Sequence, residues 1–236
     1  MKNLSYFFAL ALFIGASSFA ITPPEIISNA DAIRNPSQNF HLKVAVTSTD
    51  TDDQSIFDVS IQGNTRTLIR TLSPARDKGR NMLMLEEDMW SYLPTLKRAV
   101  RVSLSQKLTG QAANGDISRM RWAEDYEATL TQETPKEWVL HLKGKKKGLT
   151  YDQLDVWVEK DSFRPLKANY LSVTGQTLKE ASYLDYKLMA GKQRPTKIVI
   201  QDAIKKSASS ILTILEMESR DFPQSLFTQG NLSRSE

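Results

Sequence analysis

Apolar and polar residues alternate along most of the chain, from 40–46 to 209–218, with the two-residue period of strands. Short segments rich in glycine or charge separate the alternating stretches, as at Gly63-Asn64 and Gly191. We count about ten or eleven such strands with hairpin-like links. The series predicts a mainly-β fold: an antiparallel barrel or a strongly curved antiparallel sheet.

Two segments depart from this alternation. The first is 26–33, where apolar residues recur at helical spacing. It follows Thr22-Pro23-Pro24-Glu25, the pattern of a helix start with a capping box, and it stops at Asn35-Pro36. We therefore expect a short amphipathic helix here. The second segment is 103–124, which we expect to be a long loop with a short helix, and long loops are often functional.

The most informative stretch is a predicted hairpin at 82–93, with its turn at Glu86-Glu87-Asp88. A turn symmetric about Glu87 places four large side chains on one face: Met82, Met84, Trp90 and Tyr92. Leucines and Met89 then occupy the other face, so both faces are apolar, unlike a sheet with one solvated face. The hairpin needs apolar cover on both sides. That cover is either a ligand or the chain itself, through the N-terminal helix or the 103–124 loop.

The first 20 residues have the pattern of a signal peptide. Lys2 precedes an apolar run at 6–15, and Ser18-Phe19-Ala20 offers small residues for cleavage after Ala20. The run is shorter than the roughly 20 apolar residues of a membrane span. Residues 21–236 are then expected to form a single domain of an exported, periplasmic protein.

Composition narrows the chemistry. The chain has no cysteine, which excludes thiol catalysis, disulfides and thiolate metal sites. Its net charge of +4 argues only weakly for an anionic partner, and export disfavours nucleic acid. His41 and His141 lack the spacing of a metal pair, and we expect both at the surface. Lys145-Lys146-Lys147 forms either a solvated hairpin tip or a contact for anionic lipid headgroups. Without a catalytic motif, we expect no enzyme, no cofactor and no metal.

Several segments resemble one known family. The stretch at 79–102, GRNMLMLEEDMWSYLPTLKRAVRV, resembles the G…L…W-x-Y-x-P…R-x-x-R-[IV] block of the LolA/LolB-like outer-membrane lipoprotein-sorting proteins. The closing segment at 221–232, DFPQSLFTQGNL, resembles the family's F/L-P-x-x-x-F-T-x-x-N-L pattern. KANY at 167–170 and RPTKIVIQD at 194–202 also fit. In the loop NGDISRMRW at 114–122, Asp116 and Ser118 match the family's G-S-D-F-S-Y-E-D-like string, but Arg119 and Arg121 replace its acidic end.

The resemblance implies an incomplete β-barrel with helices over its open side and an apolar cavity between them. Related carriers hold the acyl chains of lipoproteins or phospholipids there, between an inner-membrane transporter and an outer-membrane acceptor. We predict cavity walls at Met82, Met84, Trp90, Tyr92, Trp138 and Val156. We predict that Ile26, Ala30 and Ile33 form the inner face of a helical lid, and that Arg98 and Arg101 lie at the rim, where they fix the lid or meet headgroups.

Two alternatives to a carrier remain at this stage. Some family members are similar to partners of RND-type exporters, which suggests an accessory module whose apolar face binds a protein instead of a lipid. A hydrolase with an unrecognised site would need a polar cluster that converges inside the cavity.

Overall fold

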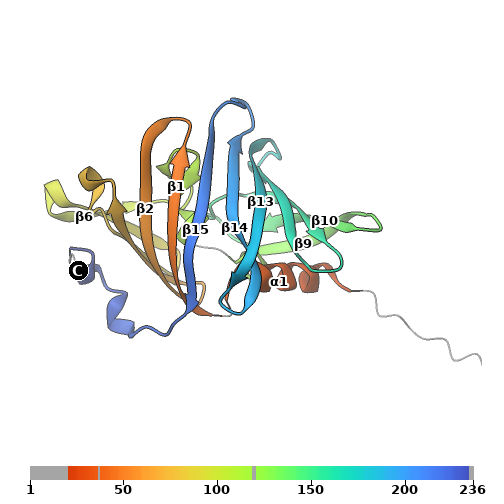
Figure 1. Cartoon of the computed structure of the whole chain (residues 1–236), viewed down its shortest axis with the longest axis horizontal. Helices are drawn as coiled ribbons and strands as arrows, with labels where there is room; N and C mark the ends of the chain where they lie inside the picture. The colour runs from red at the N-terminus through yellow and green to blue at the C-terminus, as the bar shows by residue number, and fades with distance from the viewer. Residues whose placement is uncertain (1–20, 37, 119–120, 234–236) are drawn as a thin grey trace, which may run out of the picture.

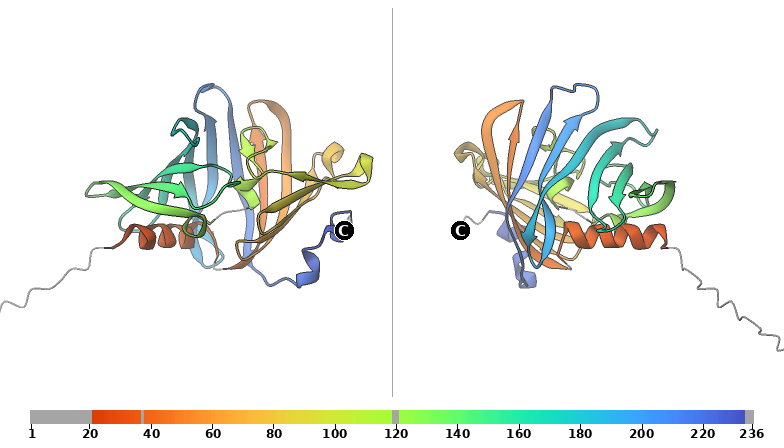
Figure 2. Two further views of the ribbon diagram at one scale, coloured as in Figure 1. Left: turned by 180° about the vertical axis from the view of Figure 1, so that it is seen from behind. Right: turned by 45° about the vertical axis from the view of Figure 1, so that its right-hand side comes forward.

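One large antiparallel sheet forms the body of the protein. The computed structural model describes residues 21–36, 38–118 and 121–233, with backbone alone at 51–53. The sheet has 13 strands in the order β6-β5-β4-β3-β2-β1-β15-β14-β13-β12-β11-β10-β9. It curves strongly without closing on itself (Figures 1 and 2), so the predicted mainly-β, half-barrel fold is confirmed. The strand count was underestimated, and the predicted signal peptide at 1–20 lies outside the described residues.

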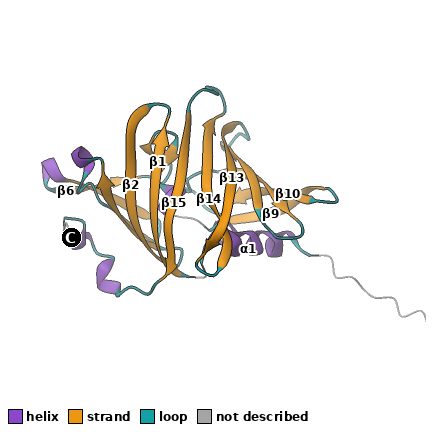
Figure 3. Cartoon of the chain, in the orientation of Figure 1, coloured by secondary structure: helices purple, strands orange, loops and turns teal. Residues whose placement is uncertain are grey.

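The elements follow one another mostly as hairpins, and strands make up most of the described chain (Figure 3). The strands are β1 (Asn39–Ser48), β2 (Thr51–Gln62), β3 (Arg66–Ser73), β4 (Met82–Leu85), β5 (Asp88–Leu93), β6 (Arg98–Val102), β7 (Lys107–Thr109), β8 (Ala112–Ala113), β9 (Tyr126–Glu133), β10 (Glu137–Gly144), β11 (Gln153–Glu159), β12 (Pro165–Leu171), β13 (Thr177–Met189), β14 (Lys192–Asp202) and β15 (Ser209–Ser219). The helices are α1 (Pro23–Arg34), α2 (Gly115–Ser118) and α3 (Trp122–Asp125), with 3-10 turns η1 (Ala75–Asp77), η2 (Pro94–Leu96), η3 (Gln224–Leu226) and η4 (Gln229–Asn231).

The N-terminal helix α1 begins and ends where the sequence predicts. The Glu25 carboxylate accepts hydrogen bonds from the backbone N–H and the hydroxyl of Thr22, at 2.8 and 2.7 Å. Asn35 leaves the helix in an extended conformation, as expected for a residue before proline. The predicted 103–124 loop contains two short helices, α2 and α3, and the separate two-stranded sheet of β7 and β8.

The hairpin of β4 and β5 has a different register from the one predicted. Its turn has two residues, Glu86 and Glu87, with Leu85 opposite Asp88 and Leu83 opposite Trp90. Glu86 has a positive φ of 56°, which allows this tight turn. A shift of one residue moves every side chain of a strand to the other face. Trp90 and Tyr92 therefore lie on the face opposite Met82 and Met84, and the predicted four-residue wall is wrong.

The C-terminal segment covers this second, outer face. Leu68 and Leu83 of the sheet are fully buried beneath Phe227 and Leu232, and Trp90 and Tyr92 pack at the edge of the same cluster. The side chain of Asn81 also donates to the carbonyl of Leu232, at 3.0 Å. Figure 1 shows the segment turning back from β15 toward the β2–β6 side of the sheet. The hairpin is apolar on both faces because the chain covers one face with its own C-terminus.

Candidate functional site: the concave face and its helical cover

The concave face of the sheet holds the main hydrophobic core, and α1 lies across it (Figure 2). Ile26, Ile27 and Ala30 point inward with at most 1% of their surface exposed. The main contacts of α1 are with the helix α3 and with the strands β9, β12 and β14, which belong to the β14–β9 part of the sheet. Each isoleucine buried in this way contributes about 1.5–3 kcal/mol, so the apolar stripe alone favours a closed cover.

Buried polar contacts fix the C-terminal half of α1. The carboxylate of Asp31 accepts from Arg34 at 3.0 Å and from the backbone N–H of Ala123, in α3, at 2.8 Å. The Arg34 guanidinium lies 3.6 Å from the centre of the Trp122 ring. Arg194 of β14 donates to the carbonyls of Ala32 and Ile33, each at 3.0 Å. These contacts join α1 to α3 and to the sheet.

Burial shifts the pKa of two groups in these contacts, Asp31 and Arg194. Loss of water around Asp31 raises the pKa of its carboxyl from 3.8 to about 6, although Arg34 and the Ala123 N–H oppose the change. Desolvation lowers the pKa of Arg194 to about 10, so its guanidinium stays charged at neutral pH. The cover is therefore held by charges that are costly to bury, which is a different principle from simple apolar packing.

Little free volume remains in the inner core itself, whereas a larger hollow of about 460 Å³ lies at the polar C-terminal end of α1, among Asn35, Glu124 and Lys192. A hollow of about 40 Å³ lies under α1 and α3, among Arg34, Trp122, Tyr170, Tyr183 and residues of β14 and β15. A second hollow of about 130 Å³ lies toward the β6 end, and Met82 helps to line it. Typical ligand sites hold about 300–1,000 Å³. An acyl chain between the helices and the inner core would thus require α1 or α3 to move outward.

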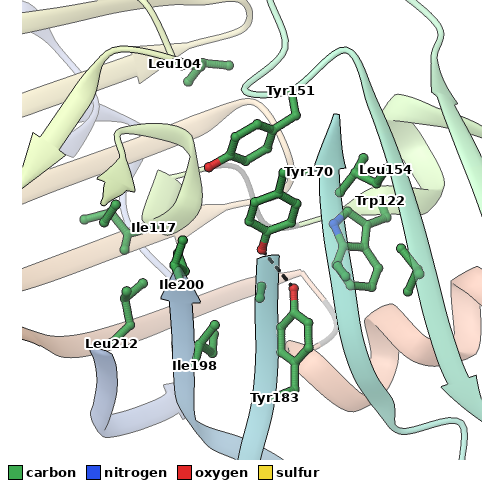
Figure 4. Packing of buried hydrophobic residues seen from close by; sticks show 14 of the residues in the cluster. Leu104, Ile117, Trp122, Tyr151, Leu154, Tyr170, Tyr183, Ile198, Ile200 and Leu212 are labelled. Carbon is green, nitrogen blue, oxygen red and sulfur yellow. Dashed lines mark hydrogen bonds between the residues drawn. The ribbon is translucent and has the colours of Figure 1, made fainter. Parts of the chain in front are cut away.

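Four tyrosines lie together on the inner side of the site. Figure 4 shows Tyr151, Tyr170 and Tyr183 arranged between Trp122 and the aliphatic floor of Ile198, Ile200 and Leu212. The rings of Tyr151 and Tyr170 stack with their centres 4.2 Å apart. The hydroxyls of Tyr170 and Tyr183 form a hydrogen bond of 3.2 Å, and Tyr126 donates to the backbone carbonyl of Tyr151 at 2.8 Å.

Asp116, which matches the family pattern, belongs to a polar chain beside these tyrosines. Its carboxylate accepts from the Ala113 N–H at 2.8 Å and from the Tyr151 hydroxyl at 3.1 Å. Lys179 donates to the carbonyl of Gln111 at 2.6 Å and to the Tyr151 hydroxyl at 3.4 Å. Burial raises the pKa of Asp116 and lowers that of Lys179, so each depends on the other's charge for compensation. The loop segment with α2 is anchored to β13 through this chain.

The structure brings together some of the predicted site residues and separates others. Met82, Met84, Trp138 and Val156 all belong to the inner core. Trp90 and Tyr92 belong to the outer cluster under the C-terminal segment. On α1, Ile26 and Ala30 face inward, Ile33 is only half-buried, and the buried Ile27 was missed.

The predicted basic residues do not form one group. Arg98 and Arg101 lie exposed on the edge strand β6, where Arg101 pairs with Asp88, whereas the cover is held by Arg34 and Arg194. In the lysine run, Lys145 donates to the carbonyl of Ala123 at 2.9 Å, so it braces α3.

The histidines are paired with carboxylates in the sheet. His41, predicted at the surface, is 8% exposed and hydrogen-bonds Asp58 at 2.7 Å, and His141 bonds Asp155 at 2.8 Å. Among the residues that the structure describes, no cluster of histidine and acidic side chains could hold a metal ion. No helix in the described ranges is long and apolar enough to span a membrane.

Fold and cavity together define an open half-barrel β protein whose concave apolar face is covered by a helix. The crystal structure of LolA superfamily protein NE2245 from Nitrosomonas europaea is similar to it, with 36% identity and a TM-score of 0.84 over 90% of this chain and 100% of that one. A family model described only as "-like: Uncharacterized protein" matches residues 63–234. The chain therefore belongs to the LolA superfamily.

More distant structures share the fold. A domain named for outer membrane lipoprotein sorting, from Vibrio parahaemolyticus, is 20% identical with a TM-score of 0.73 over 90% of this chain and 98% of its own. A DUF1329 family protein from Desulfovibrio piger is 18% identical with a TM-score of 0.75, over 89% and 97% of the two chains. No curated protein matches the sequence.

Proposed function

We propose that the protein is a periplasmic carrier that binds the acyl chains of a lipoprotein or lipid between α1 and the concave face of the sheet. The observation that carries this proposal is the cover itself. An apolar surface is closed by one short helix, which presents only Ile26, Ile27 and Ala30 as fully buried apolar side chains. Acyl chains could replace this stripe on the same surface.

The energetics favour such an exchange. Each acyl CH₂ group removed from water contributes about 0.8 kcal/mol, so a few methylenes match one isoleucine of α1. The polar contacts of Arg34 and Arg194 would break as the helix moves. This cost offsets part of the gain from acyl-chain burial, so the bound and free forms stay close in free energy. A carrier needs this balance, because it must release its cargo when an acceptor offers equal burial.

Export and partners belong to the same proposal. The signal-like residues 1–20 would direct the chain to the periplasm, and superfamily membership is in keeping with outer-membrane lipoprotein sorting. An inner-membrane transporter would load the carrier and an outer-membrane acceptor would unload it. No catalytic step is part of this scheme.

Native mass spectrometry of the exported protein tests the proposal. We expect co-purified acyl lipid, and we expect Ile200→Gln on the inner face of β14 to reduce the bound fraction at least about tenfold, as lost apolar burial predicts. The matched control is Val199→Gln, its neighbour on the outer face, which should keep the lipid. Circular dichroism checks that both variants fold. Lipid-free wild-type protein, or equal loss in both variants, would refute the proposal; a co-purifying membrane protein without lipid would favour the exporter accessory.

A further inference from the structure

The hydroxyl groups of Tyr170 and Tyr183 share one hydrogen bond inside the site. The two residues are 5% and 3% exposed, and their hydroxyl oxygens lie 3.2 Å apart. Each hydroxyl carries one proton to donate and can accept two hydrogen bonds. One proton forms the bond between them, and no other described group accepts the second.

Three neighbouring tyrosines each donate their hydroxyl proton to a separate acceptor. Tyr151 donates to Asp116, Tyr126 donates to the carbonyl of Tyr151, and Tyr186 donates to the carbonyl of Pro165 at 2.6 Å. In each case the single proton has its own acceptor. A buried donor without one costs free energy comparable to a lost hydrogen bond, so the pair is built to receive an acceptor from outside the chain.

The surroundings restrict what that acceptor can be. The pair lines the 40 Å³ hollow under α1 and α3, together with the apolar side chains of Trp122, Ile198 and Leu212 (Figure 4). The charged Arg34 also lines the hollow, but its guanidinium is paired with Asp31 at 3.0 Å. The ring of Trp122 contacts Tyr183 edge-on, with the ring centres 5.8 Å apart. Burial raises the pKa of both tyrosines, so the hydroxyls stay neutral donors. The site therefore suits a neutral oxygen atom attached to an apolar chain.

We propose that the Tyr170–Tyr183 hydroxyl pair is a carbonyl-binding site that accepts the ester or amide carbonyl at the head of an acyl chain. This inference rests on the proposed carrier function and adds a ligand class to it. The free hydroxyl proton donates to the carbonyl oxygen while the methylenes lie on the aliphatic floor. The pair then distinguishes acylated cargo, from a phospholipid or a lipoprotein, from a plain hydrocarbon chain.

Ester-linked and ether-linked phospholipids with the same headgroup and chain length test the inference, because they differ in the carbonyl. An equimolar mixture is offered to the delipidated full-length protein, and native mass spectrometry reads the ratio of the two bound lipids. We expect the wild type to favour the ester about two- to tenfold, the range of one net hydrogen bond. A parallel arm adds a synthetic diacyl lipopeptide with the same chains, and its share of the bound lipid tells a lipoprotein source from a phospholipid source.

Variants at the pair separate donation from packing. Tyr170→Phe and Tyr183→Phe each leave one hydroxyl that can donate, so each single variant should keep a preference for the ester. The double variant has no donor and should bind ester and ether alike. Tyr92→Phe on the outer face is the control and should behave as wild type. The infrared carbonyl band of bound ester lipid should move to higher wavenumber in the double variant, which a purely structural role would not cause.

The outcomes are distinct. Equal binding of ester and ether by the wild type means that the pair holds only water, and this overturns the carbonyl site while leaving the carrier function intact. A preference that survives in the double variant overturns it as well. Binding of neither lipid refutes the carrier function itself.

Discussion

The two faces of the sheet are covered in different ways. On the concave face, α1 combines a short apolar stripe with buried charges: Asp31, Arg34 and Arg194 are 3%, 8% and 2% exposed. On the outer face, the C-terminal segment relies on apolar side chains, with Phe227 and Leu232 buried over Leu68 and Leu83. Polar contacts there are few, such as Gln62 to the carbonyl of Phe222 at 3.3 Å.

The difference shows which cover is suited to move. Apolar packing is non-directional and contributes roughly in proportion to area, so it holds a segment in place permanently. Buried ion pairs add little net stability, because desolvation offsets their attraction, but they fix one geometry and are lost together when the partners separate. The outer cover is packed like part of the core, whereas the inner cover is suited to open as one unit.

The largest expected effect is on the outer cover. Phe227→Ala should lower the free energy of unfolding by about 3 kcal/mol, because it removes a buried ring from the cluster over Leu83. Urea denaturation measures this loss. Phe222→Ala, at a half-buried position, should cost less and serves as the comparison. Lipid content should not change in either variant, and a loss of lipid in Phe227→Ala would show that the two covers are coupled.

A comparable local effect is expected on the inner cover. Arg34→Leu leaves Asp31 without its cation, which costs about 3 kcal/mol for a buried pair. The cost should fall on α1 alone, as faster amide hydrogen exchange at 26–34. The exposed Arg220, whose ion pair with the exposed Glu218 spans 3.9 Å, provides a matched control in Arg220→Leu. Global unfolding without selective exchange in α1 would contradict the hypothesis that α1 opens separately from the sheet.

A smaller effect follows from the pKa of Asp31, which is raised to about 6 by burial. The closed form binds the proton more tightly than a form in which Asp31 is solvated, so closure weakens as pH rises through 6. Between pH 5 and pH 7 we expect a loss of about 1 kcal/mol in the docking of α1. Hydrogen exchange corrected for its intrinsic pH dependence measures it. Asp31→Asn should remove the dependence, and an unchanged slope in that variant would assign it to another group.

The sequence predicted the fold well and the site only partly, for reasons that individual residues illustrate. Period-two alternation and the Thr22–Glu25 capping box depend on neighbours in sequence, and both predictions were confirmed. The β4–β5 register depended on whether the turn has two or three residues. Glu86 adopts its positive φ without the glycine or asparagine that usually signals a two-residue turn.

The tyrosine cluster was missed because its members come from three strands and one loop, which lie far apart in the sequence. The sequence pattern indicates only ordinary strand or loop positions for Tyr126, Tyr151 and Tyr170. Their shared position depends on the curvature of the whole sheet, which local patterns do not determine. The family-like match at Asp116 was the one available signal, because this residue hydrogen-bonds Tyr151. Likewise, the family-like C-terminal motif was recognised without its role as the outer cover.

The open edges of the sheet have a mechanical consequence. In the described chain, β6 and β9 each have a single strand neighbour, so no backbone ladder ties one end of the sheet to the other. One contact near this gap is the exposed ion pair of Lys146 and Glu87, at 2.9 Å, of a kind worth at most about 1 kcal/mol. Small changes of twist between neighbouring strands could add up to a wider concavity while every ladder hydrogen bond is kept. The sheet would act as an elastic wall, and the bulk of the cargo would set its curvature.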